Sequence, residues 1–201
     1  MLRVGLTGPA GSGKSTVAAW LYEAGCPIVE ADQAAHELYV PGSRLVQDLA
    51  RAFGDHILRA DGSVDRSALG RIVFGSTAAR EQLNALVHPA LVANLKRRMD
   101  AIESGGAWVA ILDAALLLQW HADRLVDLIV GVWAPREMRL ARLIAAGMSA
   151  DLAAARVDAQ MTEAVLRKSS DILIENTRTP DDLRASVARL LEDLKRRAAS
   201  E

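Results

Sequence analysis

The chain has little cysteine, no long hydrophobic run and almost no net charge, and each absence excludes a class of protein. Cys26 is the single cysteine among 201 residues, so an internal disulfide is excluded and a reducing cytoplasm is expected. The most apolar stretch, residues 108–118, contains Asp113 and is too short to span a bilayer. The net charge of −1 offers no global attraction for nucleic acid. The composition, 51% hydrophobic, predicts a soluble globular protein.

The N-terminal part of the chain alternates strand and helix signals. Residues 4–7 form a short apolar run that stops at a glycine-rich segment, residues 8–13. Residues 14–23 carry apolar side chains at helical spacing, and residues 27–32 are expected to form a second strand that finishes at its acidic end. Strand, helix and strand in this order predict a βαβ unit, and therefore a parallel sheet.

The rest of the chain divides into a helical middle and a second set of strands. Residues 33–104 contain helical patterns at 43–53 and 76–87 and no convincing strand. Further strands are expected at 108–112, 125–133 and 171–175, and helices at 136–146, at 149–161 and from 180 onward. Ser149 and Thr179 are the expected N-caps of the last two helices.

The glycine-rich segment matches a phosphate-binding motif. Gly8-Pro9-Ala10-Gly11-Ser12-Gly13-Lys14-Ser15 fits the pattern G-x-x-x-x-G-K-[ST], with a predicted strand before it and a helix after it. Such a loop turns backbone N–H groups toward phosphate oxygens at the positive end of the helix dipole. We expect Lys14 to reach the β- and γ-phosphates of ATP, and the Ser15 hydroxyl to bind Mg²⁺. Motif and context together disfavour the alternative, a chance glycine-rich turn.

A P-loop alone does not separate a kinase from a GTPase or a motor ATPase. The segment after the last strand, residues 175–178, does not match the N-K-x-D motif that reads guanine. A helical insertion and an arginine-bearing helix pair suit a small-molecule kinase with a lid. We therefore predict an α/β P-loop NTPase fold, a parallel sheet flanked by helices. Its parts would be a core of residues 1–32, 105–135 and 163–201, an all-helical acceptor-binding insertion at 33–104, and a helical lid at 136–162.

An ordered series of short motifs resembles the dephospho-CoA kinase family nearly from end to end. The matching residues are Gly5-Leu6-Thr7-Gly8, Gly11 to Ala18 (Thr16 included), Ala31-Asp32, Pro41-Gly42, Phe53-Gly54, Asp61 to Arg66, Leu69, Val73-Phe74, His88-Pro89, Asp113, Leu116-Leu117, Arg139, Arg142, Arg156, Gln160, Asp171 and Asn176. The chain departs from the family pattern at Pro9-Ala10, at Glu30, and at Ala115 and Gln119. The departures at Ala115 and Gln119 weaken any active-site role that the family resemblance would assign to the segment around Leu116-Leu117.

The resemblance implies an ATP-dependent kinase that phosphorylates the ribose 3′-hydroxyl of dephospho-CoA, the last step of coenzyme A synthesis. Its substrates would be ATP and dephospho-CoA and its metal Mg²⁺, with no nucleic acid, membrane or obligate protein partner. Within the enzymes, the alternative is a kinase for another small acceptor, such as a nucleoside monophosphate or a sugar acid. The alternative from another class is a regulatory protein that holds a nucleotide without rapid turnover.

The catalytic candidates are Lys14, Asp32 and Arg139. Asp32 is expected at the carboxyl edge of the sheet, where a carboxylate can take the proton of the attacking hydroxyl; the alternative is an N-cap for the next helix. Arg139 would neutralise charge that develops on the transferred phosphoryl group, against the alternative of a solvated surface arginine.

The remaining candidates each have a structural alternative. Residues 8–16 with Arg142 and Asn176 would bind ATP, and Gln160 and Asn176 would lie near the adenine. Arg139, Arg142, Arg156 and Gln160 would belong to the lid. Asp113 would hold Mg²⁺ through water, or else be a structural carboxylate. Thr7, Asp32, Arg66 and His88 would contact the acceptor. The structural alternatives are a backbone hydrogen bond for Thr7, a salt bridge with Asp65 or another acid of the insertion for Arg66, and a structural role for His88. Backbone hydrogen bonds are the alternative for Gln160 and Asn176.

Overall fold

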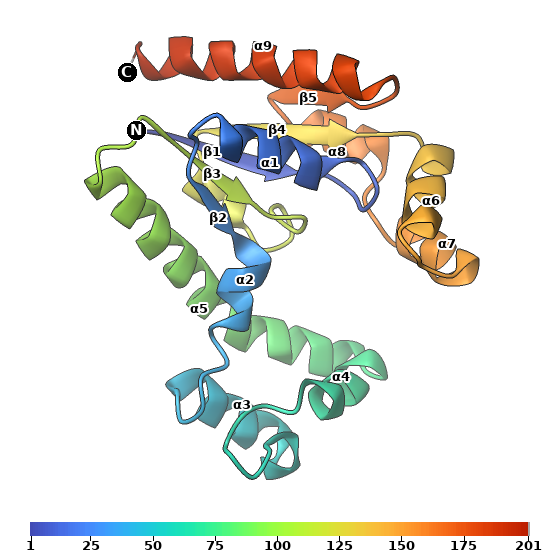
Figure 1. Cartoon of the computed structure of the whole chain (residues 1–201). Helices are drawn as coiled ribbons and strands as arrows, with labels where there is room; N and C mark the ends of the chain where they lie inside the picture. The colour runs from blue at the N-terminus through green and yellow to red at the C-terminus, as the bar shows by residue number, and fades with distance from the viewer. Residues whose placement is uncertain (201) are drawn as a thin grey trace. The chain divides into compact units, whose positions relative to one another are not determined.

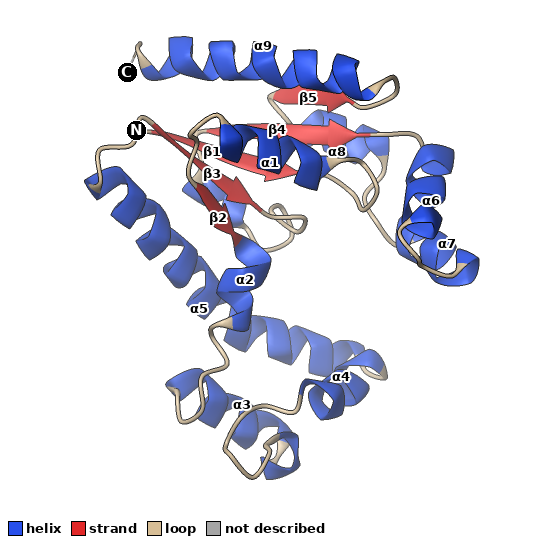
Figure 2. Ribbon diagram, in the orientation of Figure 1, coloured by secondary structure: helices blue, strands red, loops and turns tan. Residues whose placement is uncertain are grey.

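The computed structural model describes residues 1–200 and forms an α/β fold with one parallel sheet (Figure 1; Figure 2). The sheet holds five strands in the order β2-β3-β1-β4-β5. The elements are β1 (Leu2–Thr7), α1 (Lys14–Glu23), β2 (Ile28–Glu30), α2 (Ala31–His36), α3 (Arg44–Phe53), η1 (Asp55–Ile57), α4 (Arg66–Phe74), α5 (Thr77–Ser104), β3 (Val109–Asp113), η2 (Ala122–Leu125), β4 (Leu128–Trp133), α6 (Arg136–Ala145), α7 (Ala150–Asp158), α8 (Glu163–Ser169), β5 (Ile172–Glu175) and α9 (Pro180–Ala198). The predicted fold class is therefore confirmed.

The chain divides into two compact units. One contains residues 1–29 and the chain from residue 99 onward, and the other contains residues 30–98. We call them the sheet unit and the helical unit. Among the described residues, no helix is long and apolar enough to cross a membrane.

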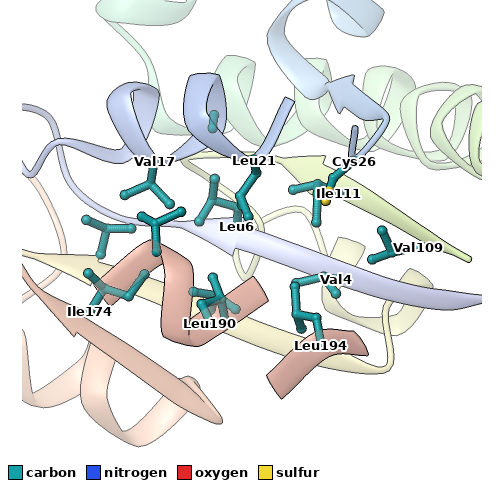
Figure 3. Close-up of a cluster of buried hydrophobic side chains, with 14 of the residues drawn as sticks. Val4, Leu6, Val17, Leu21, Cys26, Val109, Ile111, Ile174, Leu190 and Leu194 are labelled. Carbon is teal, nitrogen blue, oxygen red and sulfur yellow. The ribbon is translucent and has the colours of Figure 1, made fainter. Parts of the chain in front are cut away.

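The main core of the sheet unit lies on one face of the sheet. Alternate residues of β1, Val4 and Leu6, are fully buried there, as the two-residue period of a strand requires. Helices α1 and α9 cover this face, and Leu21 and Leu194 belong to the same cluster (Figure 3). Helix α9 begins at a capping box, because Thr179 and Asp182 exchange side-chain and backbone hydrogen bonds.

The opposite face is covered by α8 and by the segment that follows β3. A Cβ atom at Gly131 would lie 2.4 Å from Ser170 Oγ and 3.1 Å from a methyl group of Leu166. A Cβ atom at Gly5 would lie 2.7 Å from Leu117. Glycine in β1 and β4 therefore lets the covering segments approach the sheet closely.

The helical unit has a core of its own. Val46, Leu49 and Phe53 of α3 pack with Ile57 and with apolar residues of α4 and α5. The buried amide of Asn94 also donates to the carbonyl of Ala34 at 3.2 Å. The only bridge outside the named strands, among the described residues, pairs Leu58 with Val64.

The structure differs from the sequence-based expectation at several points. Strand β2 ends at Glu30, and Ala31 and Asp32 already belong to α2. Helix α5 continues through Pro89, although proline removes one helical hydrogen bond, so the predicted helix at 76–87 was too short. Helix α8 was not predicted. Ser149 takes the N-cap position of α7, but its side chain makes no capping hydrogen bond.

Removing the buried side chain of Leu21 tests how α1 is held on the sheet. Leu21 is 1% exposed, so Leu21→Ala should lower the free energy of unfolding by about 2–5 kcal/mol through lost contacts and a cavity. Tyr22→Ala is the matched control, because the neighbouring Tyr22 is 68% exposed and its removal should cost less than about 0.5 kcal/mol. Chemical denaturation measures both, and equal losses would contradict the packing of α1.

Candidate functional site

The site is built where four strands end at the same edge of the sheet. Strands β1, β3, β4 and β5 are parallel, with Leu6 paired to Asp113, Thr7 to Gly131, and Trp133 to Glu175. Their carboxyl ends therefore lie together, which is where open α/β sheets bind ligands. The glycine-rich loop follows β1 directly at this edge.

The loop needs glycine where its backbone meets other segments. Gly11 has a φ of 76°, and a Cβ atom there would lie 2.7 Å from the carbonyl oxygen of Arg139 in α6. Gly13 has a φ of 96°, and a Cβ atom there would lie 2.3 Å from Nδ2 of Asn176. Both positions combine a left-handed backbone with a close neighbour, so no other residue fits them without strain.

The N-terminus of α1 is left open. Gly13 takes the N-cap position and provides no side-chain cap, and the first turn contains no acidic residue. The amides of Thr16 and Val17 already donate to the Gly13 carbonyl. The preceding amides, including that of Ser15, remain at the positive end of the helix dipole, which suits an anion such as phosphate.

Lys14 and Asp113 form an ion pair at the ends of α1 and β3. Their side chains are only 17% and 13% exposed. The pair places an ammonium group and a carboxylate side by side next to the loop. Among residues 1–200, no cluster of three or more histidine, cysteine or acidic residues could hold a metal ion. A Mg²⁺ ion here would fit its usual protein environment, with one or two side-chain oxygens and ligands from substrate phosphates and water.

Thr7 is fully buried at the end of β1. Its hydroxyl donates to the carbonyl of Ala115 at 3.4 Å, in the segment that follows β3. This is the backbone bond that the structural account of Thr7 required. A contact between Thr7 and an acceptor stays a prediction.

Asn176 and Arg142 hold the outer side of the loop. Asn176, which follows β5, is 6% exposed, and its Nδ2 donates to the carbonyl of Ser12 at 2.8 Å. Arg142 on α6 donates from Nη1 to the carbonyl of Gly11 at 3.1 Å. Its Nη2 donates to both oxygens of Asn176, backbone and side chain, at 3.3 Å each. Both residues thus contact the phosphate-binding loop itself.

Arg139 is buried rather than solvated. It is 4% exposed, and its guanidinium lies over the ring of Trp133 with 4.8 Å from Cζ to the ring centroid. Burial lowers the pKa of Arg139, and the nearby charge of Arg136 lowers it further. Its Nε and Nη1 atoms have no hydrogen-bond partner among the described residues. The surface-arginine alternative is therefore wrong, and an anionic ligand would supply the missing acceptors.

Gln160 also contacts the loop. Its Oε1 accepts a hydrogen bond from the backbone N–H of Ala10 at 2.8 Å, which links the end of the α7 segment to the loop. Arg156 lies exposed on α7. Arg136 forms two hydrogen bonds of 2.8 Å with Asp158, which joins the start of α6 to the end of α7.

The other candidates belong to the helical unit. Asp32 is exposed in the first turn of α2, whose N-cap position is Glu30, so the proposal that Asp32 caps this helix is wrong. Arg66 lies over the ring of Tyr39 at 5.0 Å and donates to the carbonyl of His36 at 3.2 Å. His88 lies half-buried within α5.

The structure thus brings most sequence-predicted residues of the sheet unit to one loop, while Asp32, Arg66 and His88 lie in the helical unit. Sequence reasoning missed Trp133, the platform beneath Arg139. The two residues lie on a strand end and a helix separated by a turn, and no periodic pattern relates such positions.

A glycine comparison tests the close approach of Asn176. Gly13→Ala and Gly25→Ala both place a side chain at a positive φ, 96° and 85°, at a cost of about 1–2 kcal/mol. Nothing lies within 4 Å of the Cβ position at Gly25. We therefore expect Gly13→Ala to lower the free energy of unfolding more than Gly25→Ala and to abolish ATP binding. Denaturation and calorimetric titration measure both, and ATP affinity retained in Gly13→Ala would contradict this geometry.

Comparison with known proteins agrees with the geometry. The family model described as dephospho-CoA kinase matches residues 2–182. A dephospho-CoA kinase of Frankia casuarinae is 41% identical over 194 residues, which cover 96% of this chain and 84% of that protein. The crystal structure of TT1252 from Thermus thermophilus superimposes with a TM-score of 0.77 at 33% identity, over 96% of this chain and 97% of that one. A dephospho-CoA kinase from Campylobacter jejuni shares the fold, with a TM-score of 0.73 at 23% identity and 96% of each chain covered. The chain belongs to the dephospho-CoA kinase family.

Proposed function

We propose that the chain transfers the γ-phosphoryl group of ATP to the ribose 3′-hydroxyl of dephospho-CoA. The single observation that carries the proposal is the open N-terminus of α1 beneath a complete phosphate-binding loop, in a chain of this family. Phosphoryl transfer needs little covalent chemistry from the protein. It needs phosphates held in place, charge neutralised and a hydroxyl in line, and the candidate residues divide these tasks.

Lys14 and the loop amides hold the phosphates. In the structure the Lys14 ammonium pairs with Asp113 at the end of β3, so the ammonium group already lies at the edge of the sheet where the strands end. The triphosphate would compete for this ammonium, and the Asp113 carboxylate would then be free to accept a hydrogen bond from a metal-bound water. Mg²⁺, when bound, supplies charge neutralisation of the β- and γ-phosphates. Ser15 would be its hydroxyl ligand.

Asp32 is the proposed group that orients the acceptor hydroxyl and takes its proton. Asp32 is exposed, and the role that would otherwise explain it, the N-cap of α2, is excluded because Glu30 takes the N-cap position. A positioned carboxylate typically contributes about 10²–10⁴ in rate.

The polar side chains of α6, of α7 and of the segment after α7 are proposed to serve two tasks, which are to neutralise charge on the transferred phosphoryl group and to form a lid. Arg139 has unpaired Nε and Nη1 atoms, so its charge-assisted donors suit oxygens of the transferred phosphoryl group. Gln160 and Arg156 would complete a lid at residues 136–162. The bond from Ala10 to Gln160 is one contact through which such a lid would engage the loop.

The helical unit is proposed to bind the acceptor. Arg66, which lies over the ring of Tyr39, presents a cation suited to a phosphate of dephospho-CoA, and His88 is a second candidate contact. Thr7 would lie on the acceptor side of the loop. These contacts, like the role of Asp32, rest on the family resemblance and on the chemistry of the side chains.

Acceptor choice tests the proposed reaction. The test is coupled ADP production with saturating ATP and Mg²⁺. The kcat/KM for AMP should be several orders of magnitude below that for dephospho-CoA, since remote parts of a substrate contribute to transition-state binding. Lys14→Ala is the control for the donor site, and it should abolish turnover while the fold survives. Equal rates with AMP and dephospho-CoA would favour a nucleotide kinase. ATP binding without turnover on any acceptor would favour a regulatory protein.

Asp32→Asn tests the proposed base. Asparagine keeps the size of the side chain and removes its charge and basicity, so kcat should fall by about 10²–10⁴. The melting temperature should change little, because a first-turn carboxylate contributes only about 0.3–1 kcal/mol through the helix dipole. Glu81→Gln makes the same chemical change at an exposed site on α5 and should leave kcat unaltered. Full activity in Asp32→Asn would remove Asp32 from the catalytic group.

A further inference from the structure

We propose that Asn176 and Arg142 form a clamp on the outer side of the phosphate-binding loop and act as positioning residues for it. The clamp holds the carbonyls of Gly11 and Ser12 away from the ligand, and so directs the N–H of Gly13, which follows the Ser12 carbonyl, toward its phosphates. The inference rests on the proposed function only in taking a polyphosphate as the ligand. It departs from the sequence-based interpretation, in which Asn176 lies near the adenine.

Every polar group of Asn176 is engaged within the sheet unit. Its backbone N–H donates to the carbonyl of Trp133 at 2.7 Å, which fixes the residue to the end of β4. Its side-chain Nδ2 donates to Ser12, and its two oxygens accept from Arg142. A flipped amide would turn its NH₂ group toward the guanidinium, where both partners are donors, so the contacts also fix the amide orientation. The side-chain oxygen and one of the two N–H donors of Nδ2 are therefore committed to Arg142 and to the loop rather than to a base.

Arg142 joins the clamp to α6. Its Nη1 donates to the carbonyls of Gly11 and Ser12, at 3.1 and 3.5 Å, while its Nη2 donates to Asn176. All of these acceptors are neutral, and among the described residues Arg142 forms no salt bridge. Its positive charge therefore stays uncompensated beside the loop, which favours an anionic ligand on the other side.

The geometry of the peptide bond converts outward carbonyls into inward amides. In a planar trans peptide the C=O and the next N–H point in opposite directions, and no cis peptide occurs among the described residues. The N–H of Ser12 is used within the loop, where it donates to the Pro9 carbonyl at 3.1 Å. The N–H of Gly13 has no partner among the described residues, and the clamp on the Ser12 carbonyl sets its direction. This amide is the one that the clamp prepares for phosphate.

The clamp also accounts for the glycine at position 13. The amide nitrogen of Asn176 lies 2.3 Å from the place of a Cβ atom at Gly13. A side chain there would displace Asn176 from the Ser12 carbonyl before any ligand is bound. The glycine and the asparagine are therefore parts of one arrangement.

Binding of inorganic tripolyphosphate, which lacks a base, separates a loop clamp from an adenine contact. We expect Asn176→Ala to weaken the binding of ATP and of tripolyphosphate by a similar factor, about 10-fold, because one buried hydrogen bond to the loop is lost. Isothermal titration with each ligand measures both affinities. Loss of ATP affinity alone would place Asn176 at the base and overturn the proposal, as would unchanged affinity for both ligands.

Further variants separate positioning from folding. Arg142→Gln removes the charge and the paired donors but keeps an amide group. It should also weaken the binding of both ATP and tripolyphosphate. In the double variant Asn176→Ala/Arg142→Gln the combined loss should be smaller than the product of the single losses, since both residues act on the same carbonyl of Ser12. Thr177→Ala, an exposed change in the same turn, should leave both affinities unaltered. Fully multiplicative losses would overturn the clamp.

The binding test is independent of the acceptor. A wild-type protein that binds tripolyphosphate but does not phosphorylate dephospho-CoA would contradict the proposed function and leave the clamp intact. A wild-type protein that phosphorylates dephospho-CoA, with both affinities unchanged in Asn176→Ala and Arg142→Gln, would contradict the clamp and leave the function intact. Failure of the wild type to bind tripolyphosphate would overturn the clamp.

Discussion

A loop that binds phosphate must turn its N–H groups inward, and its carbonyls then need partners on the outside. Here the partners come from two elements that follow the loop in sequence by more than a hundred residues, α6 and the turn after β5. Buried carbonyls without partners would be costly, so the loop depends on these neighbours for its conformation. The glycines of the loop follow from the same constraint, because the neighbours approach the backbone too closely for a side chain.

Charge is distributed around the loop in two forms. Lys14 is paired with Asp113, so it adds no net charge until a ligand separates the two. Arg139 and Arg142 form no salt bridges within the described residues and have neutral or aromatic neighbours instead. A cluster of cations with few local counter-charges attracts an anionic nucleotide. Because the net charge of the whole chain is −1, this attraction comes from the cations around the loop and not from the overall charge.

The two compact units have separate cores, which allows separate tasks. The sheet unit contains the complete loop and its supports, and the helical unit contains Asp32 and the Arg66–Tyr39 pair. The proposed division assigns the donor to the first and the acceptor to the second. Asp32 lies close in sequence to the boundary between them, at the start of the helix that directly follows β2.

Local patterns in the sequence determined the parts of this protein that depend on neighbouring residues. The phosphate-binding motif between β1 and α1, the Thr179 cap of α9 and most strands could be predicted, because a turn, a cap or an apolar period involves residues close in the chain. Two local predictions were wrong where signals competed. The acidic end of residues 27–32 proved helical, and the helix predicted at 76–87 continues through Pro89 to Ser104. Helix α8 was missed because its seven residues are too few to show a helical period of apolar side chains.

Only the tertiary structure decided which distant residues meet at the loop. Asn176 lies 164 residues from Ser12, and Gln160 lies 150 residues from Ala10, yet both bond to the loop backbone. Such contacts depend on the order of the strands, since β1 lies between β3 and β4 and their ends therefore surround the loop. The burial of Arg139 on Trp133 was likewise invisible in the sequence, where an arginine on a helix is indistinguishable from one in solvent. Residue type and spacing specify what a side chain can do, and packing alone specifies which partner it has.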